Sequence, residues 1–160
     1  MSAFLGGFIA QEIVKFTGKY SPLKQWFHYD VFESLPDGSP DRTPMNCRYD
    51  DQIKIYGREI QDKISKVNTF MIGAGALGCE YLKAFALMGL GCGQGGKVEV
   101  TDNDNIEVSN LNRQFLFRKQ HVGKSKSECS SGQAKVMNPE FNVQAYTSLV
   151  APNTEGLFND

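Results

Sequence analysis

A glycine-rich turn constrains the fold of this chain more than any other feature. Residues 73–78 read Gly-Ala-Gly-Ala-Leu-Gly and directly follow the mostly apolar run 67–72, and Leu77, Tyr81 and Phe85 then recur at helical spacing. Between a strand and a helix, three such glycines allow a tight turn, close approach of the backbone to a phosphate, and close packing of the helix on the strand. The free N–H groups at the helix start stabilise an anion. A glycine-rich turn without a ligand is the alternative.

The sequence around this turn alternates between strand and helix patterns. Strands are predicted over 67–72, 97–102 and 142–147, and helices over 77–86 and 125–137. This β-α-β-α-β order is half of a doubly wound parallel α/β sheet. The chain has 160 residues, of which 41% are hydrophobic and 22% charged, which is enough for one folded domain. A formal net charge of -1 excludes a general nucleic-acid or polyanion binder.

The part of the chain before the sheet reads as a separate piece. Apolar residues from Phe4 to Ile13 follow helical spacing up to Gly18, and the aromatic run 25–30 predicts a strand. A helix and one strand cannot enclose a core, so residues 1–36 are expected to be the tail of another domain. Residues 36–44 hold three of the six prolines and no large apolar side chain, which predicts a linker over 37–46. The sheet then belongs to residues 47–160.

Charged residues are sorted by sign after the second predicted strand. Asp102 comes 24 residues after Gly78, where a carboxylate that holds a ribose belongs. Asp104 and Glu107 extend this acidic edge, although solvated loop residues are the simpler reading. Residues 113–126 then carry only basic charges: Arg113, Arg118, Lys119, Lys124 and Lys126. A triphosphate recruits more Arg and Lys than a dinucleotide does, so this run favours ATP over NAD, with a solvated basic face as the alternative for Arg118 and Lys119.

The other reactive side chains form no recognisable catalytic group. The four cysteines are 32, 13 and 37 residues apart, which is not the spacing of a zinc knuckle or a redox dithiol: Cys47, Cys79, Cys92 and Cys129. They are expected to be reduced, with Cys79 as a buried, inert thiol. His28 and His121 have no suggested Ser or Cys partner, which argues against catalysis by either. The apolar N-terminal run of ten residues is neither a secretion signal nor a membrane span, so no membrane partner is expected.

Several stretches of this sequence resemble the ubiquitin-activating enzyme family. They are Arg48-Tyr-Asp-Asp-Gln-Ile53, the 73–78 turn, Val100-Thr-Asp-Asn-Asp104, Ser109-Asn-Leu-Asn-Arg-Gln-Phe-Leu-Phe117 and Met137-Asn-Pro139. Pro22 to Trp26 and Glu33 to Pro36 resemble the end of that family's first, inactive adenylation repeat. The resemblance implies that residues 1–36 are the tail of that repeat. It also implies that residues 47–160 are the nucleotide-binding part of the active repeat, with an incomplete Rossmann-like sheet of the ThiF-type adenylation fold.

The resemblance further implies a reaction and its participants. The family joins the C-terminal carboxylate of ubiquitin to the α-phosphate of ATP-Mg²⁺, releases pyrophosphate, and passes the acyl group to a cysteine. Carried over by motif, the ATP-binding residues are Gly73, Gly75, Ala76, Gly78, Asp102, Asp104, Asn110, Arg113, Gln114 and Lys126. Arg113 and Lys126 are the expected catalytic residues, because they would screen phosphate charge. Ubiquitin and ubiquitin-conjugating enzymes are the expected partners, and cytoplasm and nucleus the expected locations.

The sequence also departs from the family pattern. It stops at Asp160, before the aspartate that binds magnesium, the catalytic-cysteine domain and the module that recruits conjugating enzymes. We therefore expect a fragment that binds ATP weakly, is inactive alone, and holds no metal ligand and no nucleophilic cysteine. Gly132 weakens the helix of Lys126 by about 1 kcal/mol relative to Ala. Two alternatives remain open: an NAD-dependent oxidoreductase, from the glycine turn and Asp102, and a non-catalytic adenylation-like scaffold.

Overall fold

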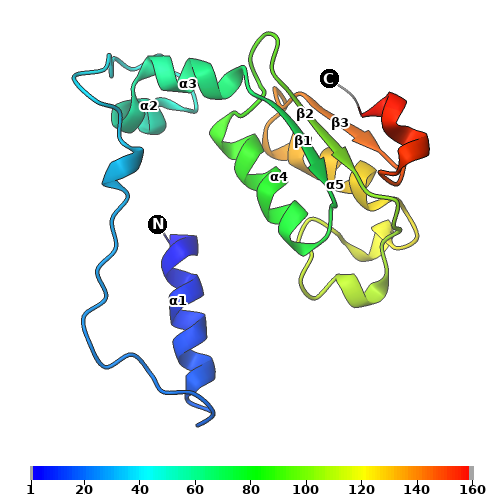
Figure 1. Cartoon of the computed structure of the whole chain (residues 1–160), viewed down its shortest axis with the longest axis horizontal. Helices are drawn as coiled ribbons and strands as arrows, with labels where there is room; N and C mark the ends of the chain where they lie inside the picture. The colour runs from blue at the N-terminus through cyan, green and yellow to red at the C-terminus, as the bar shows by residue number, and fades with distance from the viewer. Residues whose placement is uncertain (1, 159–160) are drawn as a thin grey trace. The chain divides into compact units, whose positions relative to one another are not determined.

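The chain divides into two structural units, Met1–Ser34 and Leu35–Asp160. The computed structural model describes residues 2–158. Helix α1 (Ser2–Lys15) and the short 3-10 helix η1 (Phe32–Ser34) are the regular elements of the first unit, and all other elements lie in the second (Figure 1).

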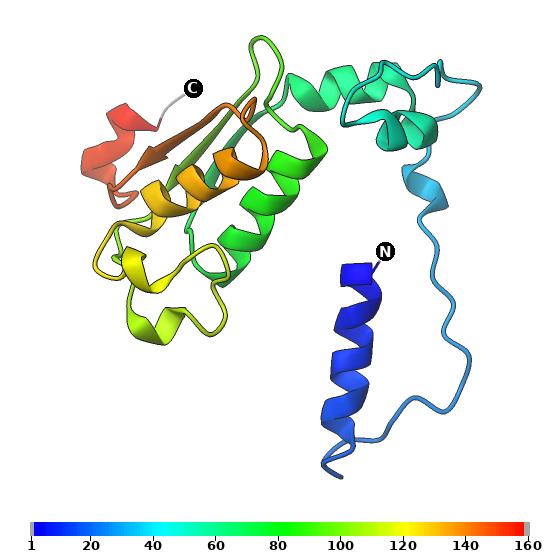
Figure 2. The ribbon, with the colours of Figure 1, turned by 180° about the vertical axis from the view of Figure 1, so that it is seen from behind.

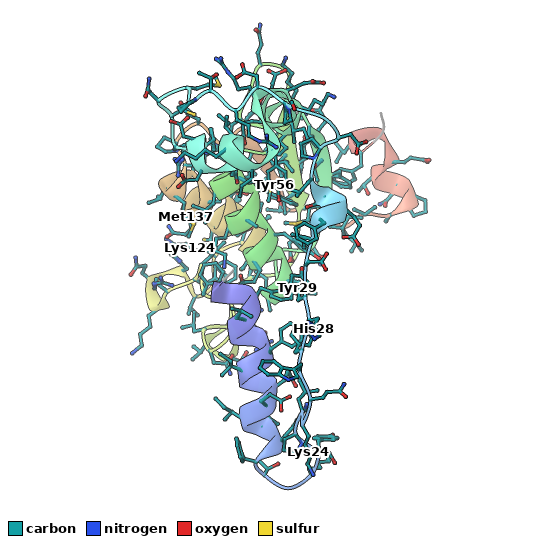
Figure 3. All side chains as sticks on the ribbon, turned by 90° about the vertical axis from the view of Figure 1, so that its left-hand side faces the viewer. Lys24, His28, Tyr29, Tyr56, Lys124 and Met137 are labelled. Atoms are coloured by element: carbon teal, nitrogen blue, oxygen red, sulfur yellow. The ribbon has the colours of Figure 1, made fainter. Side chains whose placement is uncertain are left out.

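The first unit is a helix with an irregular aromatic segment folded against it. Helix α1 forms where the spacing predicts, and the turn after it ends at Gly18, whose φ is +81°. The strand predicted over residues 25–30 is wrong, because no strand lies beside this segment in the described part of the unit to share backbone hydrogen bonds. Its aromatic rings pack on α1 instead: the Phe27 and Phe8 centroids are 4.4 Å apart, and Tyr29, labelled in Figure 3, lies 4.0 Å from Phe4.

The second unit is built on a parallel sheet of three strands in the order β1-β2-β3. The strands are β1 (Asn68–Ile72), β2 (Lys97–Thr101) and β3 (Val143–Tyr146). Phe70 of β1 is in register with Glu99 of β2, and Val100 of β2 with Ala145 of β3. The predicted α/β class and strand positions are confirmed.

Two helices, α4 (Ala76–Met88) and α5 (Lys126–Met137), cover one face of this sheet, as the views from the two sides show (Figures 1 and 2). The core lies between them and the strands and is made of small and branched apolar side chains, among them Leu82, Ala86, Val98, Val100 and Ala134. Each of these helices follows a strand in the sequence and leads back to the start of the next parallel strand. Both helices therefore begin at the carboxyl ends of the strands.

Shorter elements complete the second unit. They are α2 (Asp50–Tyr56), α3 (Arg58–Ser65), and the 3-10 helices η2 (Val108–Asn110), η3 (Lys119–His121) and η4 (Pro152–Leu157). Residues of the proline-rich segment contact the start of α3, where the Arg58 N–H donates to the Asp41 carbonyl at 2.8 Å. Phe158 follows η4 and stacks on Phe70 at 5.0 Å, so it covers part of the second sheet face. Among the described helices, none is long and apolar enough to cross a membrane.

Candidate functional site

The glycine turn joins β1 to α4 and requires glycine at two positions, one because of its backbone conformation and one because of close packing. Gly73 has a φ of +98°, and its N–H donates to the Thr101 carbonyl of β2 at 2.8 Å. A Cβ on Gly78 would lie 2.3 Å from the Gly73 oxygen, so helix and turn approach too closely for a side chain. Two of the three predicted glycine roles, the tight turn and the close packing, are confirmed. The third, approach to a phosphate, stays a prediction.

The start of α4 is uncapped and open. Gly75 precedes the helix, and no side chain among the described residues caps the first N–H groups of α4. A Cβ added to Gly75 would have Gln114 Nε2 as its nearest atom, at 4.0 Å, so the backbone there is open. Unpaired N–H groups and the positive end of the helix dipole attract negative charge. Ala76, the first residue of α4, stands at this opening.

Asp102 links the glycine turn to the end of β2. Its Oδ2 accepts a hydrogen bond from the Ala74 N–H at 2.6 Å, and its Oδ1 accepts one from the Asp104 N–H at 2.8 Å. These bonds orient the carboxylate and leave it able to accept further hydrogen bonds, because each oxygen has a second lone pair. The structure therefore places the predicted ribose-binding carboxylate directly beside the predicted phosphate-binding turn.

Lys126 is the first residue of α5 and is 8% exposed. Its Nζ lies 2.7 Å from Asp104 Oδ2, and its N–H donates to the Asp104 carbonyl at 3.0 Å. A buried ammonium group needs such a partner, since desolvation penalises an unpaired charge. Ser125 caps α5 through a hydrogen bond from the Glu128 N–H, and the helix continues without a break through Gly132. Although Gly132 is expected to weaken this helix, α5 is unbroken and Lys126 occupies its regular first position.

The polar loop after β2 contributes unequally to the site. Gln114 is 3% exposed, and its Oε1 has no hydrogen-bond partner among the described residues. Asn110 is also buried, but its Oδ1 accepts from the Glu107 N–H at 2.9 Å and so holds its own loop. Arg113 is exposed, and its guanidinium donates to the Ser109 carbonyl at 2.9 Å. The structure thus brings Gln114 to the glycine turn, while Arg113 lies on the surface.

Two other residues of this region have structural roles. The Arg118 guanidinium donates to the Phe115 and Phe117 carbonyls, and the Arg118 N–H donates to His121 Nδ1 at 3.1 Å. Arg118 therefore holds the loop, while Arg118 and Lys119 both remain exposed, as the alternative of a solvated basic face requires. Cys79 is fully buried, as predicted, and burial raises the pKa of its thiol to about 11, which disfavours the reactive thiolate. No group of three or more His, Cys, Asp or Glu side chains that could hold a metal occurs within residues 2–158.

Two hollows flank the glycine turn. One, of about 230 Å³, is lined by Ile72, Gly73, Thr101, Asp102, Asn103, Ser148, Leu149 and Val150. The other, of about 440 Å³, lies between the end of β1 and the first turns of α4 and is lined by Met71, Ile72, Gly73, Gly75, Ala76, Leu77, Gly78 and Tyr81. A larger hollow of about 770 Å³ lies on the second sheet face and contains none of the predicted site residues. The glycine turn and Asp102 therefore line the two smaller hollows.

Sequence reasoning did not identify the residues 148–150 that line the first hollow. No motif identifies Ser148, Leu149 or Val150, because these residues line the hollow without a charged side chain. The rule that ligands bind beyond the carboxyl ends of parallel strands would have indicated them, since they follow β3 directly.

The chain matches the ThiF family over residues 49–160. It is 51% identical to ubiquitin-activating enzyme E1 1 of Schizosaccharomyces pombe over 167 residues, and 45% identical to ubiquitin-like modifier-activating enzyme 1 of Homo sapiens over 166 residues. Both alignments cover 100% of this chain and 16% of the relative. The chain therefore spans about a sixth of the length of these relatives.

Solved structures of bacterial proteins share the fold. E. coli MccB with ATP is 28% identical, with a TM-score of 0.61 over 72% of this chain and 35% of that chain. E. coli tRNA N6-threonylcarbamoyladenosine dehydratase, TcdA, in complex with ATP has a TM-score of 0.61 and 24% identity over 69% of this chain and 43% of that chain, a likeness of fold alone. The predicted Rossmann-like adenylation fold is confirmed.

Proposed function

This chain belongs to the ThiF family, and from that premise we propose that it is the nucleotide-binding part of a ubiquitin-activating enzyme. The proposed reaction joins the C-terminal carboxylate of ubiquitin to the α-phosphate of ATP and releases pyrophosphate. Identity of 51% to the fission-yeast enzyme across the whole chain supports this assignment. The complete activity, the transfer to a cysteine and the recruitment of ubiquitin-conjugating enzymes belong to a protein about six times as long. A cytoplasmic and nuclear location is part of the same proposal.

One observation carries the proposal: the start of α4, the Asp102 carboxylate and the Lys126 ammonium meet at one edge of the sheet. We assign the phosphates to the open N–H groups of α4 and to Lys126, which would exchange Asp104 for a phosphate oxygen. Asp102 would accept from the ribose, and the 230 Å³ hollow beside it would receive the base. Gln114, with its unpartnered oxygen, would complete the polar wall.

The proposed chemistry is charge screening and positioning. A carboxylate that attacks phosphorus meets the negative charge of the phosphates, and basic side chains together with helix N–H groups reduce this repulsion. Arg113 is exposed and linked only to its own loop, so its side chain can turn toward the phosphates. Within residues 2–158, His, Cys, Asp and Glu side chains form no group of three or more that could hold a metal ion. We assign no step to Mg²⁺ and propose, from the resemblance to the family, that its protein ligand lies elsewhere in the enzyme.

Isothermal titration tests the binding step. The chain is titrated with ATP-Mg²⁺ and separately with NAD, and the titrations are repeated on Asp102→Ala. Selective ATP binding that weakens at least about tenfold in the variant supports the proposal. Equal ATP affinity in both proteins indicates a non-catalytic scaffold, and tight NAD binding indicates an oxidoreductase. In the full-length enzyme, undiminished ubiquitin-AMP formation by Asp102→Ala would contradict the assignment.

A further inference from the structure

Asn138 lies at the end of α5, and its side chain links several elements of the second unit through hydrogen bonds. It is 0% exposed, and its Nδ2 donates to the Ala86 carbonyl of α4 at 2.8 Å and to the Tyr49 hydroxyl at 2.8 Å. Its Oδ1 accepts from Arg48 Nη1 at 3.0 Å and from the Glu140 N–H at 3.2 Å. One amide therefore connects α5, α4 and the start of α2.

Further contacts stiffen this junction. Arg48 Nη2 donates to the Met137 carbonyl at 2.9 Å, so the guanidinium holds both Asn138 and the last turn of α5. The ring of Tyr49 lies against Gly89, where a Cβ would come within 2.6 Å of the Tyr49 ring. Gly89 ends α4 with a φ of +81°. The junction thus joins the carboxyl ends of α4 and α5 through hydrogen bonds and the close packing of Tyr49 on Gly89.

The opposite ends of the same two helices carry the proposed nucleotide site. Helix α4 begins at Ala76, in the glycine turn, and α5 begins at Lys126. Figure 2 shows the two helices side by side across the sheet. Hydrogen-bonded helices are stiff, so a bond that sets their separation at one end restricts it at the other.

We propose that Asn138 is a positioning residue that sets the separation between the glycine turn and Lys126 by tying α5 to α4 and α2 at their far ends. The proposal rests on the proposed function for its consequence, ATP affinity, but its structural claim stands without a ligand. Asn138 touches neither the turn nor Lys126 and acts through the two helices. Phosphate binding needs both groups at once, and a displacement of the order of 1 Å costs up to about 100-fold where geometry is demanding.

The test compares Asn138→Ala with Asn142→Ala. Asn142 Nδ2 also donates to a backbone carbonyl, that of Gly96 at 2.7 Å, but this bond ties the start of β3 to the loop before β2 and not to α4 or α5. Amide resonances of the whole chain are recorded by ¹⁵N–¹H NMR without ligand, and then during titration with ATP-Mg²⁺. We expect Asn138→Ala to shift the resonances of Gly75, Ala76 and Lys126 and to weaken ATP binding about tenfold. Asn142→Ala is expected to leave these resonances and the affinity unchanged.

The two readouts separate the two proposals. If the wild-type chain shows no saturable response to ATP, the proposed function fails, while the ligand-free shifts still test the coupling. If a folded Asn138→Ala retains wild-type resonances at Gly75, Ala76 and Lys126, the coupling is refuted. Should this variant fail to fold, Tyr49→Phe removes only the hydroxyl that accepts from Asn138. The resonances of Gly75, Ala76 and Lys126 must then shift in Tyr49→Phe, or the proposal is wrong.

Discussion

At the scale of single residues, the two glycines Gly78 and Gly132 show how differently one residue type acts within a helix. Gly78 allows α4 to start against the carbonyl of Gly73, where a Cβ would lie 2.3 Å away. Gly132 lies in the middle of α5 and is exposed, and a Cβ added there would have no atom within 4 Å. The first glycine is required by close packing, whereas the second only weakens its helix.

Gly78→Ala and Gly132→Ala should therefore change stability in opposite directions. We expect Gly78→Ala to lower the free energy of unfolding by about 1–3 kcal/mol, because the methyl group collides with rigid backbone. Gly132→Ala should raise it by up to about 1 kcal/mol through helix propensity. Urea unfolding followed by circular dichroism measures both. A Gly78→Ala variant as stable as the wild type would show that α4 can move away from the turn without cost.

At the scale of elements, polar side chains of α2 and α3 bind the end of α4. Gln52 and Gln61 both donate to the Met88 carbonyl at 3.0 Å, and Gln52 also donates to Gln61. These bonds satisfy the carbonyl of Met88, the last of α4, which lacks a partner within the helix. Tyr49 adds a further link through its hydrogen bond with Asn138. Burial raises the pKa of the Tyr49 phenol to about 12.

The raised pKa of Tyr49 predicts a loss of stability at high pH. The native state favours the neutral phenol, so this contribution is complete below the ordinary pKa of 10 and disappears as the pH rises from 10 to 12. Unfolding free energies measured from pH 8 to 11.5 should fall more steeply in the wild type than in Tyr49→Phe. Absorbance at 295 nm, recorded as the difference between the two proteins, should give an apparent pKa near 12. Equal pH profiles would place Tyr49 in contact with water.

At the scale of the whole molecule, the core belongs to one unit. The buried apolar cluster runs from Ala74 to Val143 and includes no residue of 4–34, the part of the first unit whose burial is described. In the first unit, Ile9 and Ile13 of α1 are 60% and 61% exposed, while the aromatic segment packs on Phe4 and Phe8. A short helix with so little tertiary packing is marginal in water. Stability of the second unit should therefore be independent of the first.

Removal of residues 1–34 tests this independence. The remaining chain, residues 35–160, should unfold cooperatively with a midpoint within about 4 °C of the full chain, because the core is intact. An isolated peptide of residues 1–34 should lack helical circular dichroism. Loss of the cooperative transition in the shortened chain would show that the first unit contributes to the core of the second.

Local patterns were sufficient to predict the sheet and the position of the glycine turn between β1 and α4. The alternation of strands and helices, the spacing of Gly73, Gly75 and Gly78, and the place of Asp102 all depend on residues near one another in the sequence, where backbone geometry acts directly. The strand predicted over residues 25–30 failed for the opposite reason, since a strand exists only when a partner strand accepts its hydrogen bonds.

The sequence by itself therefore determined the fold class and the residue types of the site. Only the tertiary structure decided which of these side chains meet. The pairing of Lys126 with Asp104 spans 22 residues, and the bonds of Asn138 to Arg48 and Tyr49 span 90 and 89. No local pattern predicts contacts between residues so far apart in the sequence. These contacts form when the helices pack on the sheet and each buried polar group must find a partner.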